Sequence, residues 1–246
     1  MPGRLHTSVL LEIGERLYFL DAGEACSRTA YLLGYDLTRV RGIFLSHAHM
    51  DHTGGLPNLL WTIRKLHGLS SFDGRVCEPI TVYTANLPAW TAVTDLLSCT
   101  EGGFGIDFEL NAQRLRPGLC LDTDTLRVTA VPNTHLPADP DDGPQSFSFR
   151  IESAGASLVY SGDMGSARDL EPLLQDPADL VLVETGHHSV EDLCSWAEVN
   201  RKTIRKLGFY HHGRAILHDP AAQLRVARAV TSIPVFFAND ADTVDL

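Results

Sequence analysis

Apolar and polar residues alternate along several short segments of the chain, and Gly, Pro, Asn and Asp punctuate them. This period of two predicts β-strands bounded by turns. The first two, at residues 7–13 and 16–20, flank Gly14-Glu15 and are expected to form a hairpin. Further strands are expected over residues 40–45, 79–84, 106–110, 125–131, 145–151, 157–160, 179–183, 214–217 and 233–237.

Helical spacing of apolar residues, three and four apart, occupies much of the sequence between these strands. It predicts helices over residues 26–33, 56–66, 87–97, 190–207 and 221–230. Strands and helices therefore alternate, which favours an α/β fold, with two sheets possible. No linker or repeat divides the chain, so a single domain over residues 1–246 is expected.

The composition, 44% hydrophobic and 21% charged, is that of an ordinary globular protein. A chain of 246 residues is long enough to bury a core without disulfide or metal cross-links. The five cysteines are scattered and never form a C-x-x-C pair, which indicates reduced thiols and a cytoplasmic location. Neither a signal peptide nor a run of 18 apolar residues is found, so no membrane association is expected. The net charge of -11 disfavours long nucleic acid as a partner, and a homodimer stays possible.

The densest group of metal-ligating side chains follows the strand at residues 40–45. It consists of His47, His49, Asp51 and His52. Imidazole and carboxylate suit Zn²⁺, Mn²⁺ or Fe, and no cysteine lies among them to indicate a closed structural zinc site. Two residues apart, His47 and His49 point to one side, whereas Asp51 and His52 can point elsewhere. This geometry suits two adjacent metals better than one.

Other residues able to bind metal also follow predicted strands. They are His135, Asp163, Glu184 with His187 and His188, and His218. Taken singly, a histidine such as His135 or His218 is more often structural. Their recurrence at strand ends favours convergence on one site.

The pattern His47-x-His49-x-Asp51-His52 resembles the signature of the metallo-β-lactamase-fold hydrolases. The resemblance extends over nearly the whole chain, through Asp21-x-Gly23, His135, Ser161-Gly162-Asp163 and His218. It implies a four-layer αββα sandwich of two mixed β-sheets. It also implies two divalent metal ions, zinc foremost and Mn or Fe as alternatives, which would activate a shared water.

The same resemblance implies how the ligands divide. One metal would be held by His47, His49 and His135, and the other by Asp51, His52 and His218, with Asp163 bridging them. Asp21 would either orient a ligand histidine or cap the following turn.

Three features are similar to the ribonuclease Z and small phosphodiesterase branch: Tyr160-Ser161-Gly162-Asp163, the opening Arg4-x-His6-x-Ser8, and Glu184-Thr185-Gly186-His187-His188. They imply a phosphodiester substrate. A long insertion with a Gly-Lys-Pro element is missing and the charge is acidic, so a small or cyclic nucleotide or a short RNA is expected rather than transfer RNA.

In this reading Asp51 also orients the attacking water, and Glu184 with His188, or with its neighbour His187, forms a general-acid pair; a structural role for the pair stays open. His211-His212 either lines the pocket or, as we favour, lies in an exposed turn. The acidic segment 137–144 is either a lid or, more in keeping with its turn formers, a solvated connection.

Two other functions remain open. The same residues would serve a hydrolase of carboxylic esters, thioesters, lactones or β-lactams. A non-catalytic protein that binds iron in the same cage is the second alternative.

Overall fold

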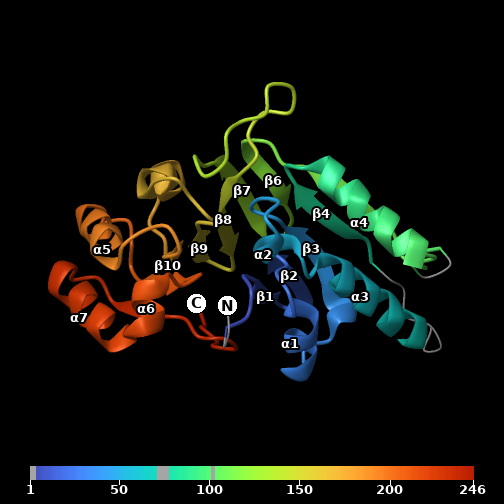
Figure 1. Ribbon diagram of the computed structural model, residues 1–246, viewed down its shortest axis with the longest axis horizontal. Coiled ribbons are helices and arrows are strands. Elements are labelled where there is room, and N and C mark those ends of the chain that lie inside the picture. The colour runs from blue at the N-terminus through green and yellow to red at the C-terminus, as the bar shows by residue number, and fades with distance from the viewer. Residues whose placement is uncertain (1–3, 71–77, 101–102) are drawn as a thin grey trace. The chain divides into compact units, whose positions relative to one another are not determined.

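The computed structural model describes residues 4–70, 78–100 and 103–246, so Cys77 lies outside them. The chain separates into two compact units, Met1–Leu115 and Arg116–Leu246, and each is built on one β-sheet (Figure 1). Both sheets are mixed and carry helices, which confirms the α/β class. The single domain expected from the sequence stays a prediction.

The first unit contains a five-stranded sheet in the order β1-β2-β3-β4-β5. Its strands are β1 (Val9–Ile13), β2 (Arg16–Leu20), β3 (Val40–Phe44), β4 (Ile80–Thr84) and β5 (Leu110–Arg114). β1 and β2 form the expected hairpin, closed by Gly14 at a φ of 56°. The strands β2 to β5 are parallel, so β2 and β3 end at the same edge of the sheet.

Helices α1 (Cys26–Leu32), α2 (Met50–Thr53), α3 (Leu56–Ser70) and α4 (Leu87–Thr100), with the 3₁₀ turn η1 (Leu37–Arg39), complete this unit. Leu56, Leu59, Leu60 and Ile63 of α3 are almost fully buried, as their spacing predicts. They pack in one core with the apolar residues of β2, β3 and β4. α3 and α4 lie side by side in Figure 1.

The second unit contains a seven-stranded sheet in the order β12-β11-β10-β9-β8-β7-β6. Its strands are β6 (Gly118–Asp122), β7 (Arg127–Pro132), β8 (Phe147–Ser153), β9 (Ala156–Tyr160), β10 (Leu180–Glu184), β11 (Leu207–Tyr210) and β12 (Val235–Phe237). β9 to β12 are parallel, and β7 runs in the same direction because β8 is antiparallel to both of its neighbours. The carboxyl ends of β7, β9, β10 and β11 therefore share one edge.

The helical elements of this unit are η3 (Ala167–Leu174), α5 (Val190–Val199), α6 (Arg214–His218) and α7 (Pro220–Val230). α5 begins at Ser189, whose hydroxyl accepts a hydrogen bond from the Asp192 amide. α7 has Pro220 in its first turn and Asp219 as its cap. α5 and α7 pack against each other and bury a core with β10 and β11.

Three sequence predictions are wrong in this region. The helix expected over 190–207 ends at Val199, and Leu207 begins β11, which the pattern missed because it contains Gly208. A glycine weakens the apolar pattern that predicts a strand. At position 208, however, the ring of Phe236 and the side chain of Leu182 leave no room for a Cβ. Residues 214–217, expected to be a strand, lie in helix α6; a four-residue apolar run does not distinguish the two.

In the connection between the units, the strand expected over 106–110 instead begins at Leu110, and β6 was not predicted. Only alternate residues of β5 are half-buried, so its signal is weak. Over residues 4–70, 78–100 and 103–246, no helix combines the length and the apolar character needed to cross a bilayer.

Candidate metal centre

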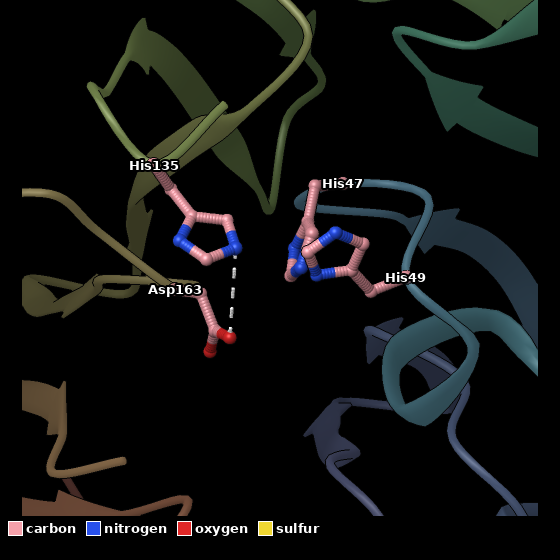
Figure 2. A group of neighbouring side chains, drawn as sticks. All are labelled: His47, His49, His135 and Asp163. Atoms are coloured by element: carbon pink, nitrogen blue, oxygen red, sulfur yellow. Dashed lines mark ion pairs between the residues drawn. The ribbon is translucent and has the colours of Figure 1, made fainter. Parts of the chain in front are cut away.

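In the first unit, three histidines gather in the loop and short helix that follow β3. The ring centroids of His47 and His49 are 4.5 Å apart, and those of His47 and His52 are 4.2 Å apart (Figure 2 shows the first pair). His52 Nε2 lies 3.8 Å from a carboxylate oxygen of Asp51. His47 and His52 are buried, whereas His49 is exposed. The sequence motif thus forms one compact group of nitrogen and oxygen donors.

Asp21 organises this group from beneath. Its fully buried carboxylate accepts hydrogen bonds from the Ser46 amide at 2.7 Å, the Ser46 hydroxyl at 2.8 Å and His52 Nδ1 at 2.7 Å. Since a carboxylate only accepts, His52 carries its proton on Nδ1 and keeps Nε2 for a metal. The Ser46 hydroxyl, which donates to Asp21, accepts from His47 Nδ1 at 3.0 Å. One carboxylate therefore fixes the tautomers of two imidazoles, which is the first of the two roles left open for Asp21.

Glycines bring the Asp21 turn against the loop that follows β3. The Ala22 amide donates to the His52 carbonyl at 2.7 Å, and the Gly55 amide donates to the Ala22 carbonyl at 2.8 Å. A Cβ on Gly55 would collide with the Gly23 carbonyl, and a Cβ on Gly23 would collide with the Asp51 carbonyl. Only glycine permits this approach of two backbones.

In the second unit, three imidazoles surround the buried carboxylate of Asp163, which is 2% exposed. His135 Nε2 lies 3.9 Å from Asp163 Oδ2, an ion pair drawn in Figure 2. His187 Nδ1 lies 3.7 Å from Oδ2, and His211 Nε2 lies 3.7 Å from Oδ1. These four side chains come from four loops: His135 follows β7, Asp163 follows β9, His187 follows β10 and His211 follows β11. The carboxyl ends of these strands share one edge of the sheet.

This second group fits a divalent cation. Asp163, Glu184 and His211 each offer one ligand atom, and these atoms lie within 4.8 Å of one another. Both carboxylates are almost completely buried, which is costly for a charged group unless a cation or hydrogen bonds compensate it. Imidazole nitrogen and carboxylate oxygen are the donor types that zinc and other first-row metals take.

The structure distinguishes the two neighbouring histidines after β10. His187 Nδ1 donates to Glu184 Oε1 at 3.0 Å, and the other Glu184 oxygen accepts from the His187 amide at 2.9 Å. The His187 side chain is 46% exposed. His188 lies 3.6 Å from Glu184, is only 18% exposed, and donates its Nε2 proton to the Met164 carbonyl at 2.9 Å. His187 is thus the imidazole that combines a carboxylate partner with access to solvent.

His218, expected as the last metal ligand, is the exposed final residue of α6, and within the described ranges it belongs to no group of candidate ligands. Residues 214–217 form a helix, so His218 does not follow a strand as expected. Its role as a ligand stays a prediction.

His211 was missed as a site residue, since an exposed turn was favoured for it. It directly follows β11, has a φ of 46°, and its ring packs over Gly186, where a Cβ would lie 2.8 Å from the ring carbon Cε1. Like His135, it follows a strand, but β11 is only four residues long and gives a weak pattern. That strand was hidden because Leu207 was assigned to a helix.

The acidic segment 137–144 is closed by its own hydrogen bonds. The Asp139 and Gly143 amides donate to each other's carbonyls at 2.8 and 2.9 Å, and Asp139 Oδ1 accepts from the amides of Asp141 and Asp142. Residues 137–142 are exposed. This arrangement is that of the solvated connection that the sequence favoured.

Comparison with known proteins identifies relatives of this chain. Residues 19–231 match the sequence profile of the beta-lactamase superfamily domain. A ribonuclease Z of Methanothermobacter thermautotrophicus is 31% identical over 134 residues, which are 54% of this chain and 39% of that protein's length. The resemblance to the ribonuclease Z branch inferred from the sequence is confirmed.

Solved structures agree with this relationship. The metallo-beta-lactamase fold protein YhfI of Bacillus subtilis superposes with a TM-score of 0.71 at 18% identity, covering 98% of this chain and 92% of that one. The short form of human tRNase Z gives a TM-score of 0.72 at 21% identity, covering 100% of this chain and 94% of that one. At such identities the likeness establishes the fold.

Proposed function

Because the chain belongs to the beta-lactamase superfamily, we propose that it is a metal-dependent phosphodiesterase with two metal ions. The observation that carries the proposal is the buried Asp163 carboxylate with three imidazoles around it. Such a carboxylate is suited to bridge two cations, and the half-exposed His187 beside it, held by the buried Glu184, supplies a proton donor. The names of the relatives, ribonuclease Z and tRNase Z, support a phosphodiester substrate.

The proposed ligands follow the division that the resemblance implies, with one exchange. His47, His49 and His135 would hold one metal, with Asp163 as the shared ligand; these four side chains are drawn in Figure 2. Asp51, His52 and His211 would hold the other, and His211 would take the place first expected for His218. When bound, two divalent ions would lower the pKa of water and stabilise charge on the phosphoryl oxygens and the leaving group. Zinc suits these nitrogen and oxygen donors, as do manganese and iron.

The protein's own groups then handle the protons. Asp51, whose side chain is 41% exposed, accepts a hydrogen bond from the attacking water and orients it. His187, held by Glu184, protonates the leaving alkoxide from Nε2, because Nδ1 is committed to the carboxylate. We assign this step to His187 rather than His188, since the Nε2 proton of His188 is committed to a backbone carbonyl.

The substrate we propose is small: a cyclic or simple nucleotide diester, or a short RNA. The net charge of -11 opposes counterion-driven binding along a long polynucleotide. Two metal ions add only local positive charge, enough to attract a single phosphodiester.

We also propose a reducing, cytoplasmic setting. The four cysteines in the described residues, Cys26, Cys99, Cys120 and Cys194, are free. Burial raises the pKa of Cys26 to about 12 and the pKa values of Cys120 and Cys194 to about 11, so these three stay as unreactive thiols.

The test is a parallel assay of the zinc-loaded protein with bis-p-nitrophenyl phosphate and with p-nitrophenyl acetate. Turnover of the phosphodiester and little of the ester is expected. Turnover of the ester alone would instead favour a hydrolase of esters, thioesters, lactones or β-lactams. Two iron ions per chain with a visible absorption band and no hydrolysis would favour an iron-carrying protein.

A further inference from the structure

Two of the proposed metal ligands in the second unit come from strands that are not neighbours. His135 follows β7 and Asp163 follows β9, and β8 lies between these strands. Adjacent strands are about 4.8 Å apart, so the two backbones leave the sheet about 10 Å apart. Pairing with β8 aligns β7 as far as Pro132 and β9 as far as Tyr160, so beyond these residues other contacts must hold the two ligand backbones across this gap.

A single buried amide spans it. Asn133 Oδ1 accepts a hydrogen bond from the His135 amide at 3.1 Å. Asn133 Nδ2 donates to the Asp163 carbonyl at 2.9 Å and to the Ser161 carbonyl at 3.3 Å. The side chain thus contacts the backbone of both ligands, one at each end of its amide.

The surroundings fix which way the amide faces. Nδ2 also lies 3.1 Å from Ser148 Oγ, so its two hydrogens are shared among three acceptors, and that hydroxyl in turn donates to the Ser161 carbonyl at 2.6 Å. Carbonyl oxygens only accept, so the nitrogen must face the loop after β9. Asn133 is 6% exposed, and Ser148 and Ser161 are fully buried, so water does not replace these bonds.

We infer that Asn133 is a positioning residue, which sets the spacing between His135 and Asp163 and thereby the affinity of the site for metal. The inference rests on the proposed function, because it takes these two residues as ligands. Asn133 itself is no ligand, since both ends of its amide are occupied by the backbone and Ser148.

The test uses Asn133→Asp, which keeps the shape of the side chain but replaces the donor nitrogen by an oxygen facing two carbonyl oxygens. The bond from the His135 amide survives, and the bond to Asp163 is lost. Asn200→Asp is the matched control, because Asn200 Nδ2 also donates to a backbone carbonyl, that of Trp196 at 2.9 Å, in a helix end without candidate ligands.

Zinc affinity of the metal-free proteins is measured by calorimetric titration, and ligand geometry by the visible spectrum of the cobalt form. We expect Asn133→Asp to weaken zinc binding about 10-fold or more and to change the cobalt spectrum, as the loss of groups that orient ligands does. Asn200→Asp should bind zinc within about twofold of wild type, because it leaves all groups around the ligands unchanged. Equal affinity and spectra for Asn133→Asp and wild type would overturn the inference.

Two further results are informative. If Asn133→Asp does not fold, Asn133→Ala carries the same expectation without the added charge; if neither folds, the side chain is a requirement of the fold and the inference is overturned. Wild-type protein that binds zinc but cleaves no phosphodiester would overturn the proposed function and leave the positioning role intact. Wild-type protein that binds no zinc would overturn both.

Discussion

The two units contain similar groups of donors, but the donors are adjacent in sequence in one unit and distant in the other. In the first unit the donors lie within six residues of sequence, from His47 to His52, and one carboxylate, Asp21, orients two of the imidazoles. In the second unit the donors come from four strand ends. There, separate side chains hold each loop: Asn133 spans β8, and Asp169 accepts from both the amide and the hydroxyl of Thr134.

This difference has a consequence for tolerance to change. A contiguous loop keeps its donors together through its own backbone, so a single supporting side chain controls orientation more than spacing. A group assembled from four loops depends on supporting contacts for the spacing itself. Substitutions beneath the second group should therefore alter both the spacing of the donors and the affinity for metal, and those beneath the first should mainly alter the affinity.

The largest effect is expected from the donors themselves. Asp163→Ala and His49→Ala should each lower kcat/KM for bis-p-nitrophenyl phosphate by about 10³-fold or more, because several kcal/mol of charge stabilisation are lost. Far-UV circular dichroism should change little. His218→Ala is the control, since His218 is exposed at the end of α6, and its activity should match wild type. Retained hydrolysis in metal-loaded Asp163→Ala would refute the site.

The first unit is tested beneath its donors by Asp21→Asn, which keeps the shape of the side chain and removes its charge. The amide that replaces the carboxylate cannot accept from the Ser46 amide, its hydroxyl and His52 together, so the zinc dissociation constant should rise about 10- to 100-fold. Ser46→Ala should have a smaller effect, because it removes the hydroxyl between Asp21 and His47 but leaves the bonds of Asp21 to the Ser46 amide and to His52. Isothermal titration of metal-free protein measures both; an unchanged affinity in Asp21→Asn would contradict the orienting role.

Substrates with different leaving groups distinguish the role of the proposed proton donor from that of the metal ligands. His187→Asn should slow a diester with a poor alkoxide leaving group by about 10²-fold or more, and a p-nitrophenyl diester much less. The reason is that p-nitrophenolate leaves without a proton. His188→Asn, which disturbs the bond to the Met164 carbonyl, should not show this dependence. The opposite ranking would assign the step to His188.

A moderate effect is expected from Gly186→Ala, because the new methyl group would meet the His211 ring and Glu184. Overpacking of this kind costs about 1–3 kcal/mol, and the displaced ring should also weaken metal binding. Gly68→Ala is the matched control: nothing lies within 4 Å of its Cβ position in α3, so it should stabilise the protein by about 0.5–1 kcal/mol. Urea unfolding compares the two. A neutral Gly186→Ala would mean that His211 moves freely, against its proposed role.

The smallest effect concerns Glu198, at the end of α5. The Ser232 amide, Arg201 and the Thr231 hydroxyl donate to its carboxylate and lower its pKa from 4.5 to about 2. Because the folded pKa is depressed, the contribution to stability is present above the unfolded pKa and is lost as the pH falls through about 2. The stability difference between wild type and Glu198→Gln should therefore shrink between about pH 5 and pH 2. A difference independent of pH, measured by urea unfolding, would exclude this linkage.

The contrast between the units also explains what the sequence predicts. The motif from His47 to His52 could be identified because its donors are adjacent. His135 and Asp163 could be identified because His135 follows a strand with clear alternation and Asp163 follows a short apolar run. His211 could not, because its strand is only four residues long and contains Gly208, whose missing side chain is required by packing from Leu182 and Phe236.

The role of Asn133 was equally out of reach. Its partners Ser161 and Asp163 lie across an intervening strand. They are 28 and 30 positions away in the sequence, and no local pattern encodes contacts over such separations. The choice between His187 and His188 likewise depends on which ring contacts the Glu184 carboxylate. Two adjacent histidines differ only in the direction in which their side chains point, and the sequence does not give that direction.

Metal stoichiometry tests the central claim most directly. Purified protein is stripped with a chelator, reloaded with zinc, freed of excess metal, and analysed by mass spectrometry for metal per chain. We predict two zinc ions per chain for wild type and at most one for Asp163→Ala, since the shared ligand is lost. Wild-type protein that retains no zinc, or two ions that survive in Asp163→Ala, would contradict the account.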